Sequence, residues 1–375
     1  MNEQHLLYLA ESYLQKSVFP HAAAVDSDVD ALQNALSGMG QLGLLALRVP
    51  LEWGGLAVSE DTFYTFTELV ARYSGALAFL QTQHQSAAAM LAQSQNEFLQ
   101  QKYLQYLSNG QILVGVGFSH IRRRGEPLVA AVPVSGGYQV SGHVPWITGF
   151  GLFQDFIVAA TLPDGQAVFG IVPFIKTQNK LSTITFSQPL TLAAMMSTNT
   201  VTATLTDWFL PEECVVSVKP AGWIHENDQK NVLKATGLAL GCARAGLDVL
   251  QTTYSSKPLS FIAHTFAALD RELISCRIAI TQAQHQCEPW EKRLQLRAWG
   301  IDLAVRCAHA AVTVSSGAAN YSDNPAQRIY REALVFTVSG QTTAIMEATL
   351  ASLVRFGFDT VGDNALQESN SLPLP

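Results

Sequence analysis

Apolar residues recur every three or four positions along roughly the first third of the chain. This spacing is typical of amphipathic helices, because it places the apolar side chains on one face. The clearest examples are Val29, Leu32, Leu36, Phe63, Phe66, Leu69 and Val70. We therefore predict that residues 1–111 form an α-helical domain.

Three glycines in this domain, Gly38, Gly40 and Gly43, match the spacing of the G-x-G-x-x-G dinucleotide-binding motif. That motif requires a strand before it and a helix that opens within it. Here a helical segment precedes the glycines, and Val49 and Pro50 soon follow them. The better interpretation is a connector that is punctuated by glycine.

From about residue 112 the pattern changes to short apolar or alternating runs, separated by Gly, Pro, Asp and Asn. In the clearest run Thr occupies positions 200, 202, 204 and 206 while apolar residues fill the positions between them, which is the period of a half-buried strand. No helical segments separate the runs, so we predict that residues 112–222 form a small antiparallel β domain with a barrel-like shape. The predicted strands are 112–119, 128–134, 138–140, 153–162, 167–174, 182–186 and 200–206.

Helical spacing returns after Asn231. Residues 259–280 alternate apolar positions by three and four, which indicates a helix packed lengthwise against others. The predicted helices are 237–254, 259–280, 291–314 and 328–355, and together they suggest a four-helix bundle over residues 223–357. We expect the polar residues 358–375 to be a frayed tail. The fold class is therefore a multidomain α+β protein.

The composition fits an ordinary globular protein, with 48% hydrophobic and 14% charged residues in 375. A monomer of this size usually carries about a quarter charged residues, so we infer that surface is buried between subunits of a homodimer or homotetramer. The net charge of -7 argues against nucleic-acid binding, which requires a basic surface. The chain shows neither a secretory signal nor an apolar run that could span a membrane, so we predict a cytoplasmic protein without a membrane partner.

Cysteine and histidine patterns predict no metal site. The five cysteines are widely spaced and include no C-x-x-C pair, and the nine histidines include no H-E-x-x-H. A disulfide framework is not expected either.

The segment Pro145–Gly149, P-W-I-T-G, contains the strongest candidates for ligand-binding residues. The indole of Trp146 can stack on a planar ligand, and the Thr148 hydroxyl can hydrogen-bond a ring nitrogen. On local evidence alone, Trp146 is better explained as a core aromatic.

A second candidate is the basic run Arg122, Arg123 and Arg124. Three guanidinium groups on one loop can clamp a pyrophosphate or the phosphates of coenzyme A. The alternative is a solvated basic turn, and the sequence leaves both interpretations open. Beside the run, His120 is better explained as an incidental hydrogen-bonding residue than as an acid or base.

Motifs along nearly the whole chain resemble the acyl-CoA dehydrogenase family. The match extends beyond the order of helical, β and helical blocks. The segments that carry it are residues 42–56 (L-G-L-L to W-G-G-L), 101–110, 137–148 (G-Y to W-I-T), 239–254 (A-L-G to Y) and 325–345 (P to G-Q-T and I).

The resemblance implies a flavin adenine dinucleotide (FAD) between the β domain and the bundle, and a substrate that is acyl-CoA or a carrier-bound acyl thioester. By position, Trp146 and Thr148 would flank the isoalloxazine, Ser119 would reach its pyrimidine edge, and Thr342 would approach from the bundle. The electron acceptor is not indicated. The flavin supplies the redox chemistry, and the protein orients it.

The catalytic base of the family is missing. Its usual glutamate falls on Gly340, and the alternative position that some members use falls on Asn231. Neither side chain can remove a proton from carbon. Three carboxylates could take the place of this base by approaching the substrate from a different direction: Asp323, Glu226 and Asp228. A role in turns or helix caps explains each of them better.

Cofactor contacts are also reduced. The family's A-G-S-D loop is replaced by residues 120–127, and its R-x-x-F-G segment is absent after Tyr254. Flavin mononucleotide, or no flavin, therefore stands as an alternative to FAD. The first functional hypothesis is an oxidoreductase acting on the CH–CH bond of an acyl thioester with a noncanonical or missing base. The alternatives are a flavin-dependent monooxygenase on the same fold and an inactive binding or assembly scaffold.

Overall fold

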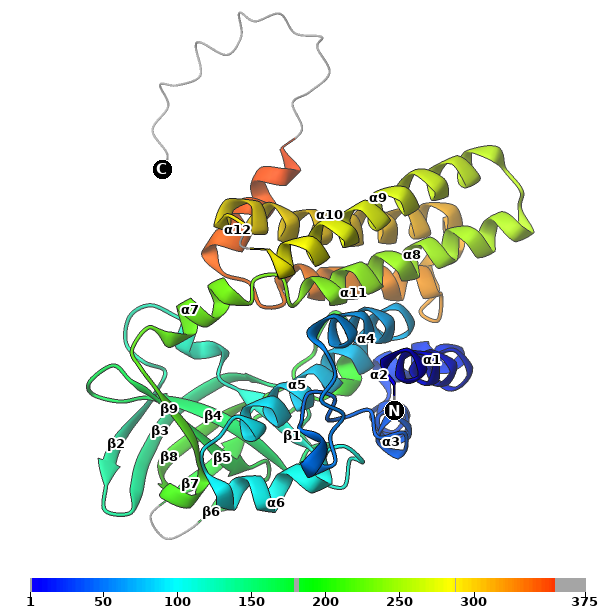
Figure 1. Cartoon of the computed structure of the whole chain (residues 1–375). Helices are drawn as coiled ribbons and strands as arrows, with labels where there is room; N and C mark the ends of the chain where they lie inside the picture. Colours follow the sequence, from blue (N-terminus) through cyan, green and yellow to red (C-terminus); the bar gives the residue numbers. More distant parts are fainter. Residues whose placement is uncertain (1, 179–181, 287, 355–375) are drawn as a thin grey trace, which may run out of the picture.

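The computed structural model describes residues 2–178, 182–286 and 288–354, arranged as helices, a sheet and further helices (Figure 1). The N-terminal helices pack together and continue to a short π-helix, Leu14–Val18, after the first of them. Their bounds are α1 Glu3–Tyr13, α2 Ala22–Ser27, α3 Val29–Gln41, α4 Glu60–Tyr73, α5 Gly75–Ala92 and α6 Glu97–Leu107. Gly38 and Gly40 lie inside α3, so no strand precedes the glycine motif, and the interpretation as a connector is wrong for these two glycines and holds only for Gly43, which follows the helix.

The middle of the chain forms one sheet, whose order in the described residues is β6-β7-β8-β3-β2-β4-β5-β9. Its neighbours are mostly antiparallel, as predicted, but β1 pairs with β4 in parallel and β2 meets β4 in parallel at one residue pair. The bounds are β1 Val114–Gly117, β2 Val129–Val134, β3 Gly137–Ile147, β4 Asp155–Thr161, β5 Ala167–Pro173, β6 Thr177–Gln178, β7 Thr183–Phe186, β8 Val201–Pro211 and β9 Val215–Lys219.

The C-terminal part is a helical bundle that lies beyond α4 and α5 from the sheet (Figure 1). Its bounds are α7 Trp223–Lys230, α8 Thr236–Ser256, α9 Ser260–His285, α10 Trp290–Ser315, α11 Pro325–Val338 and α12 Thr343–Leu353. The single helix predicted for residues 328–355 is wrong, because α11 ends at Val338 and α12 begins at Thr343. Gly340 between them has a φ of +64°, a left-handed conformation that glycine adopts without strain.

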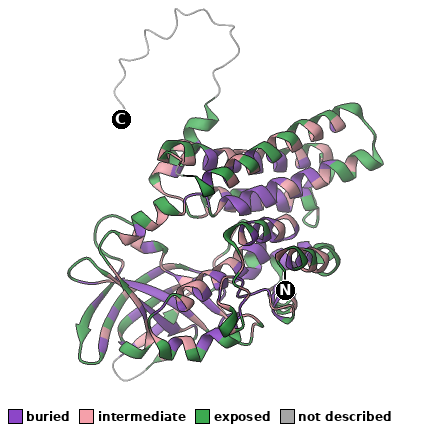
Figure 2. Cartoon of the chain, in the orientation of Figure 1, coloured by how far each residue is buried: buried purple, intermediate pink, exposed green. Residues whose placement is uncertain are grey.

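Glycines in α8 allow this helix to pack closely on two neighbours. A Cβ added at Gly241 would lie 2.2 Å from the Glu68 carbonyl oxygen of α4, and one added at Gly246 would lie 2.6 Å from the Cys307 carbonyl group of α10. Buried residues gather where the helices and the sheet face one another (Figure 2). None of the helices in the described part of the chain is long and apolar enough to cross a membrane.

His84 fixes the first strand to the helical domain. Its imidazole is fully buried on α5, where Nδ1 accepts the Val114 N–H at 3.0 Å and Nε2 donates to the Leu107 carbonyl oxygen at 3.1 Å. Burial lowers the pKa of His84 to about 4, from an ordinary value of 6.5. The neutral imidazole therefore holds the end of α6 and the start of β1 together.

This burial predicts a loss of stability in acid. Between pH 6.5 and about 4 the unfolded chain binds a proton at His84 that the folded chain does not, so the free energy of unfolding falls as the pH falls through this range, by up to about 3 kcal/mol. We expect His84→Asn, which keeps a hydrogen-bond acceptor but cannot titrate, to lose less stability between pH 7 and pH 4.5. Urea unfolding at both pH values measures the difference. The exposed His264→Asn variant is the control, and a wild-type-like pH dependence in His84→Asn would contradict the prediction.

Candidate active site

Trp146 is presented on the surface by a bulge in β3. Between Val144 and Ile147 the strand advances three residues while its partner β8 advances two, from Ala203 to Val201. Pro145 has no N–H for the ladder, which explains why the extra residue is accommodated there. The Trp146 side chain is 49% exposed, so it is not the core aromatic that local evidence allowed.

Thr148 follows the strand and is buried in a chain of three hydroxyl groups. Its Oγ1 lies 3.0 Å from Thr200 Oγ1, which lies 3.3 Å from Thr198 Oγ1, and Thr198 donates to the Met195 carbonyl oxygen at 2.7 Å. The hydroxyl proton of Thr198 is used on the Met195 carbonyl oxygen, so in the Thr198–Thr200 contact the donor is Thr200. The proton of Thr200 is then used as well, so in the Thr148–Thr200 contact the donor is Thr148. The proton of Thr148 is therefore used within the protein, and its oxygen keeps a lone pair that can accept an N–H from a ligand.

Ser119 and His120 lie on the 3₁₀ turn Ser119–Arg122 after β1. Ser119 is exposed, and its hydroxyl has no hydrogen-bond partner among the residues that the structure describes. His120 is 3% exposed and its Nε2 donates to the Ala159 carbonyl oxygen at 2.9 Å. Burial lowers the pKa of His120 to about 4, so the ring is neutral at physiological pH and serves as a hydrogen-bonding residue, which agrees with the sequence-based interpretation.

Of the three consecutive arginines, Arg122 is engaged inside the protein. Its Nε and Nη2 donate to the Asp228 carboxylate of α7 at 2.7 and 2.8 Å. Arg124 is exposed, and Arg123 lines a pocket of about 170 Å³ between this loop, the β4–β5 turn and the start of α7. The predicted clamp of three guanidinium groups therefore has two members that remain available to a phosphate.

The bundle side of the site is the segment Ser339–Thr342 between α11 and α12. Thr342 caps α12, because its Oγ1 accepts the Ile345 N–H at 3.3 Å. Gly340 is exposed, and a Cβ added there would meet nothing nearer than the Ala235 Cβ at 4.0 Å. At the position of the family's glutamate the chain therefore presents backbone and open space.

The other positions weighed for a base hold no basic group poised for catalysis. The Asn231 amide at the end of α7 donates to the backbone oxygen and side-chain oxygen of Asn227, each at 2.9 Å. Asp228 is paired with Arg122. Asp323 and Glu226 are exposed, Asp323 in a turn before α11 and Glu226 in the first turn of α7.

The sequence reasoning missed Arg297 of α10, which lies under this segment. Its side chain is fully buried, and Nη2 donates to the Ser339 carbonyl oxygen at 2.7 Å. A signal was present in the sequence, because Arg297 stands four residues before Ile301 on the stripe that continues with Ala304, Ala308 and Ala311. A cation at the start of an apolar stripe is unusual and marks a special environment.

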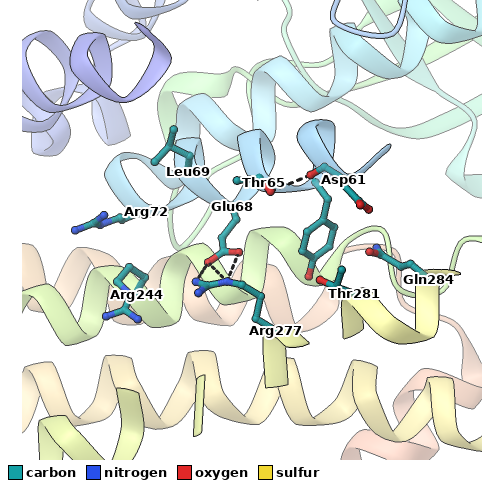
Figure 3. Close-up of a pocket in the computed structure, with 10 residues that line it drawn as sticks. Asp61, Thr65, Glu68, Leu69, Arg72, Arg244, Arg277, Thr281 and Gln284 are labelled. Atoms are coloured by element: carbon teal, nitrogen blue, oxygen red, sulfur yellow. Dashed lines mark hydrogen bonds and ion pairs between the residues drawn. The ribbon is translucent and has the colours of Figure 1, made fainter. Parts of the chain in front are cut away.

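A pocket of about 420 Å³ lies elsewhere, between α4, α8 and α9 (Figure 3). Its charged side chains are engaged in ion pairs. The Glu68 carboxylate accepts a hydrogen bond from Arg277 Nε at 2.9 Å. Arg72 pairs with Asp248, and Arg244 pairs with Asp270. Nothing among its lining residues was predicted as a site. No group of three His, Cys, Asp or Glu side chains within residues 2–178, 182–286 and 288–354 could hold a metal ion.

Comparison with known proteins shows similarity to acyl-CoA dehydrogenases. Residues 2–111 match the family model described as acyl-CoA dehydrogenase, N-terminal domain. The 3-(aryl)acrylate reductase of Clostridium sporogenes (strain ATCC 15579) is 20% identical over 370 residues, covering 93% of this chain and 98% of that protein. The mitochondrial isovaleryl-CoA dehydrogenase of Solanum tuberosum is 24% identical over 355 residues, covering 89% and 85%.

Solved structures show the same fold. Butyryl-CoA dehydrogenase from Megasphaera elsdenii superimposes with a TM-score of 0.76 at 18% identity, covering 94% of this chain and 98% of that one. Glutaryl-CoA dehydrogenase from Mycobacterium smegmatis gives a TM-score of 0.79 at 15% identity, covering 95% of both chains. The fold class inferred from the sequence is confirmed.

The Arg122–Asp228 pair predicts an energetic link between the loop that follows β1 and α7. Arg122→Ala and Asp228→Ala should each destabilise the protein, and the double variant should lose less than the sum of the two. We expect a coupling energy of about 1 kcal/mol, because both side chains are largely buried and doubly hydrogen-bonded. Urea unfolding of the four proteins measures it. Arg124→Ala combined with Asp228→Ala is the control, and additivity of the Arg122 cycle would disprove the link.

Proposed function

Because the chain belongs to the acyl-CoA dehydrogenase family, we propose that it is a flavoprotein oxidoreductase that acts on the CH–CH bond of an acyl thioester without the family's glutamate base. The observation that carries this proposal is the extent of the match. Relatives align over more than nine tenths of both chains, so the match includes both the β domain and the bundle. Location in the cytoplasm stays a prediction.

The residues on the β-domain side fit a flavin ring. A half-exposed indole at Trp146 offers a flat apolar surface, the lone pair of Thr148 can accept an N–H, and the Ser119 hydroxyl is available as donor or acceptor. A bound flavin would supply the hydride chemistry. Arg123 and Arg124 are the residues that remain for its phosphates or for those of coenzyme A, while Thr342 approaches from the bundle with a free hydroxyl proton.

The missing carboxylate defines how this protein would differ from its relatives. Without a basic group at Gly340 or Asn231, proton transfer to or from the substrate carbon must use water or a group that the substrate carries. The same observation favours a second candidate function, a flavin-dependent monooxygenase, in which no carbon-bound proton has to be removed.

An absorbance spectrum of the purified protein, before and after addition of FAD and flavin mononucleotide, tests the proposal first. Retained flavin peaks support it, and a protein that takes up neither flavin is an inactive scaffold and contradicts it. Anaerobic titration with acyl thioesters then separates the two candidates. Bleaching of the flavin supports the dehydrogenase, whereas product formation that requires oxygen and a reductant supports the monooxygenase.

Replacement of Trp146 by Ala should weaken flavin binding. Loss of one stacking surface is expected to raise the dissociation constant about 5- to 100-fold and to shift the flavin absorbance. Fluorescence titration with FAD measures both. Phe209→Ala is a matched control, because Phe209 is an aromatic residue of the same sheet that is 47% exposed. Unchanged affinity and spectrum in Trp146→Ala would show that the isoalloxazine is not bound there.

Exposed apolar residues on the outer bundle support the predicted homodimer or homotetramer. They are Phe261, Ile274 and Ile278 on α9, Leu334 and Val338 on α11, and Met346, Leu350 and Leu353 on α12. Many exposed apolar side chains on the helices of one domain are typical of a surface that is buried against another chain.

Leu350→Lys should therefore reduce the size of the assembly. The side chain is 58% exposed, so a lysine has no effect on the monomer fold but places charge in an apolar interface. Sedimentation velocity is expected to show two or four chains for the wild type and a smaller species for the variant. Leu51→Lys, on the N-terminal domain, serves as the control. A monomeric wild type would refute the assembly.

A further inference from the structure

Arg297 is a buried cation without a counter-ion. Its side chain has no exposed surface, and Nε and Nη1 have no hydrogen-bond partner in the described part of the chain. The side chain that acts on Arg297 electrostatically is Tyr64, whose pKa is raised by burial so that it is neutral at physiological pH. Thr236 donates to the Leu233 carbonyl oxygen, so the Tyr64 hydroxyl donates to Thr236 Oγ1 at 2.7 Å, and neither group is a carboxylate. Burial lowers the pKa of Arg297 to about 10, which leaves the guanidinium charged at physiological pH.

Another buried arginine of the same bundle shows what a structural role requires. Arg328 is 3% exposed and donates to the Glu332 carboxylate at 2.7 Å. A charge in a low-dielectric interior is costly unless an opposite charge or a full set of acceptors meets it. Arg297 has a single hydrogen-bond acceptor, the Ser339 carbonyl oxygen, and two of its three side-chain nitrogens have none. Packing alone does not account for a guanidinium in this state.

The location of Arg297 suggests which group supplies its missing hydrogen-bond acceptors. The guanidinium donates to the carbonyl oxygen of Ser339, which directly precedes Gly340, and the Cβ position of Gly340 faces Ala235 before α8. Gly340 is exposed and leaves open space on its side-chain side. The chain therefore has a buried cation beside the position to which the family resemblance assigns the usual glutamate, and the positive charge of Arg297 favours an anion there.

We infer that Arg297 binds the carboxylate of an acyl substrate that carries one, with the anion entering past Gly340. This inference rests on the proposed function and names its substrate class. A carboxylate accepts the N–H groups of Nε and Nη1 and neutralises the charge, so binding satisfies both partners at once. Both nitrogens are closed to solvent in the structure, so the segment Ser339–Thr342 has to move when the substrate binds.

Two pairs of probes that differ in one charge test the inference. The first pair is succinyl-CoA and butanoyl-CoA, and the second is glutaryl-CoA and pentanoyl-CoA. Calorimetric titration into the full chain, in the presence of excess FAD, is expected to give tighter binding of the charged member in at least one pair. Because Arg297 stays charged, this preference should be constant between pH 6 and pH 8.5.

Arg297→Met should abolish the preference, with binding of the carboxylate probe weakened about 10- to 100-fold and binding of its neutral partner unchanged. Arg297→Lys keeps a cation and should retain part of the preference. Arg306→Met is the matched control on the same helix, because Arg306 is paired with Asp302 and Glu272. If neither pair of probes discriminates, or if Arg297→Met keeps the preference, the inference is wrong.

A second measurement covers the case in which Arg297→Met fails to fold. Hydrogen exchange of the wild-type protein should show that the carboxylate probe changes the protection of amides 339–345, while the neutral partner does not. An identical response to both probes overturns the inference. Failure of the proposed function is distinct, because it appears as a protein that binds no flavin in the absorbance experiment, whatever the probes do.

Discussion

A buried ion-pair network on α11 holds the three parts of the molecule in register. The Glu332 carboxylate accepts the Gly75 N–H at the start of α5 and the guanidinium of Arg328. The residue before Glu332, Arg331, pairs with the buried Asp26 of α2 at 2.9 Å. Asp26 also accepts the N–H of Met195, which precedes β8. Removing one member would leave a buried charge without its partner, so the network is strongly constrained.

This network determines where the candidate active site lies. It fixes α11, and the Ser339–Thr342 segment at the end of that helix, relative to Met195 and hence to the hydroxyl chain that holds Thr148. Gly75 is required for the same reason, because a Cβ there would come within 2.6 Å of the Glu332 carboxyl carbon. The two sides of the site are thus positioned by a contact that takes no part in the chemistry.

Local pattern in the sequence was sufficient for the helices, most strands and the order of the domains. Arg331 pairs with Asp26, and Glu332 accepts the Gly75 N–H, and no local pattern reveals partners so distant in sequence. The break at Gly340 was missed because the apolar spacing continues across it. The sequence also could not show which of Arg122, Arg123 and Arg124 stays available to a ligand. Arg122 forms its ion pair with Asp228 only because α7 packs against the loop in the folded chain. Arg297 escaped notice because an isolated arginine in a helix is ordinarily a surface residue.

The loss of the carboxylate at Gly340 and the presence of Arg297 are physically coupled. A glutamate at position 340 would stand next to the residue whose carbonyl oxygen Arg297 already holds. A guanidinium that close favours the ionised carboxylate and lowers its pKa, so the group would be a weak base toward a carbon-bound proton. A carboxylate of this kind would also offset the positive charge of Arg297 and so weaken its attraction for an anionic substrate. A basic carboxylate and an open guanidinium therefore exclude each other at this position, and the chain has the arrangement that suits an anionic ligand.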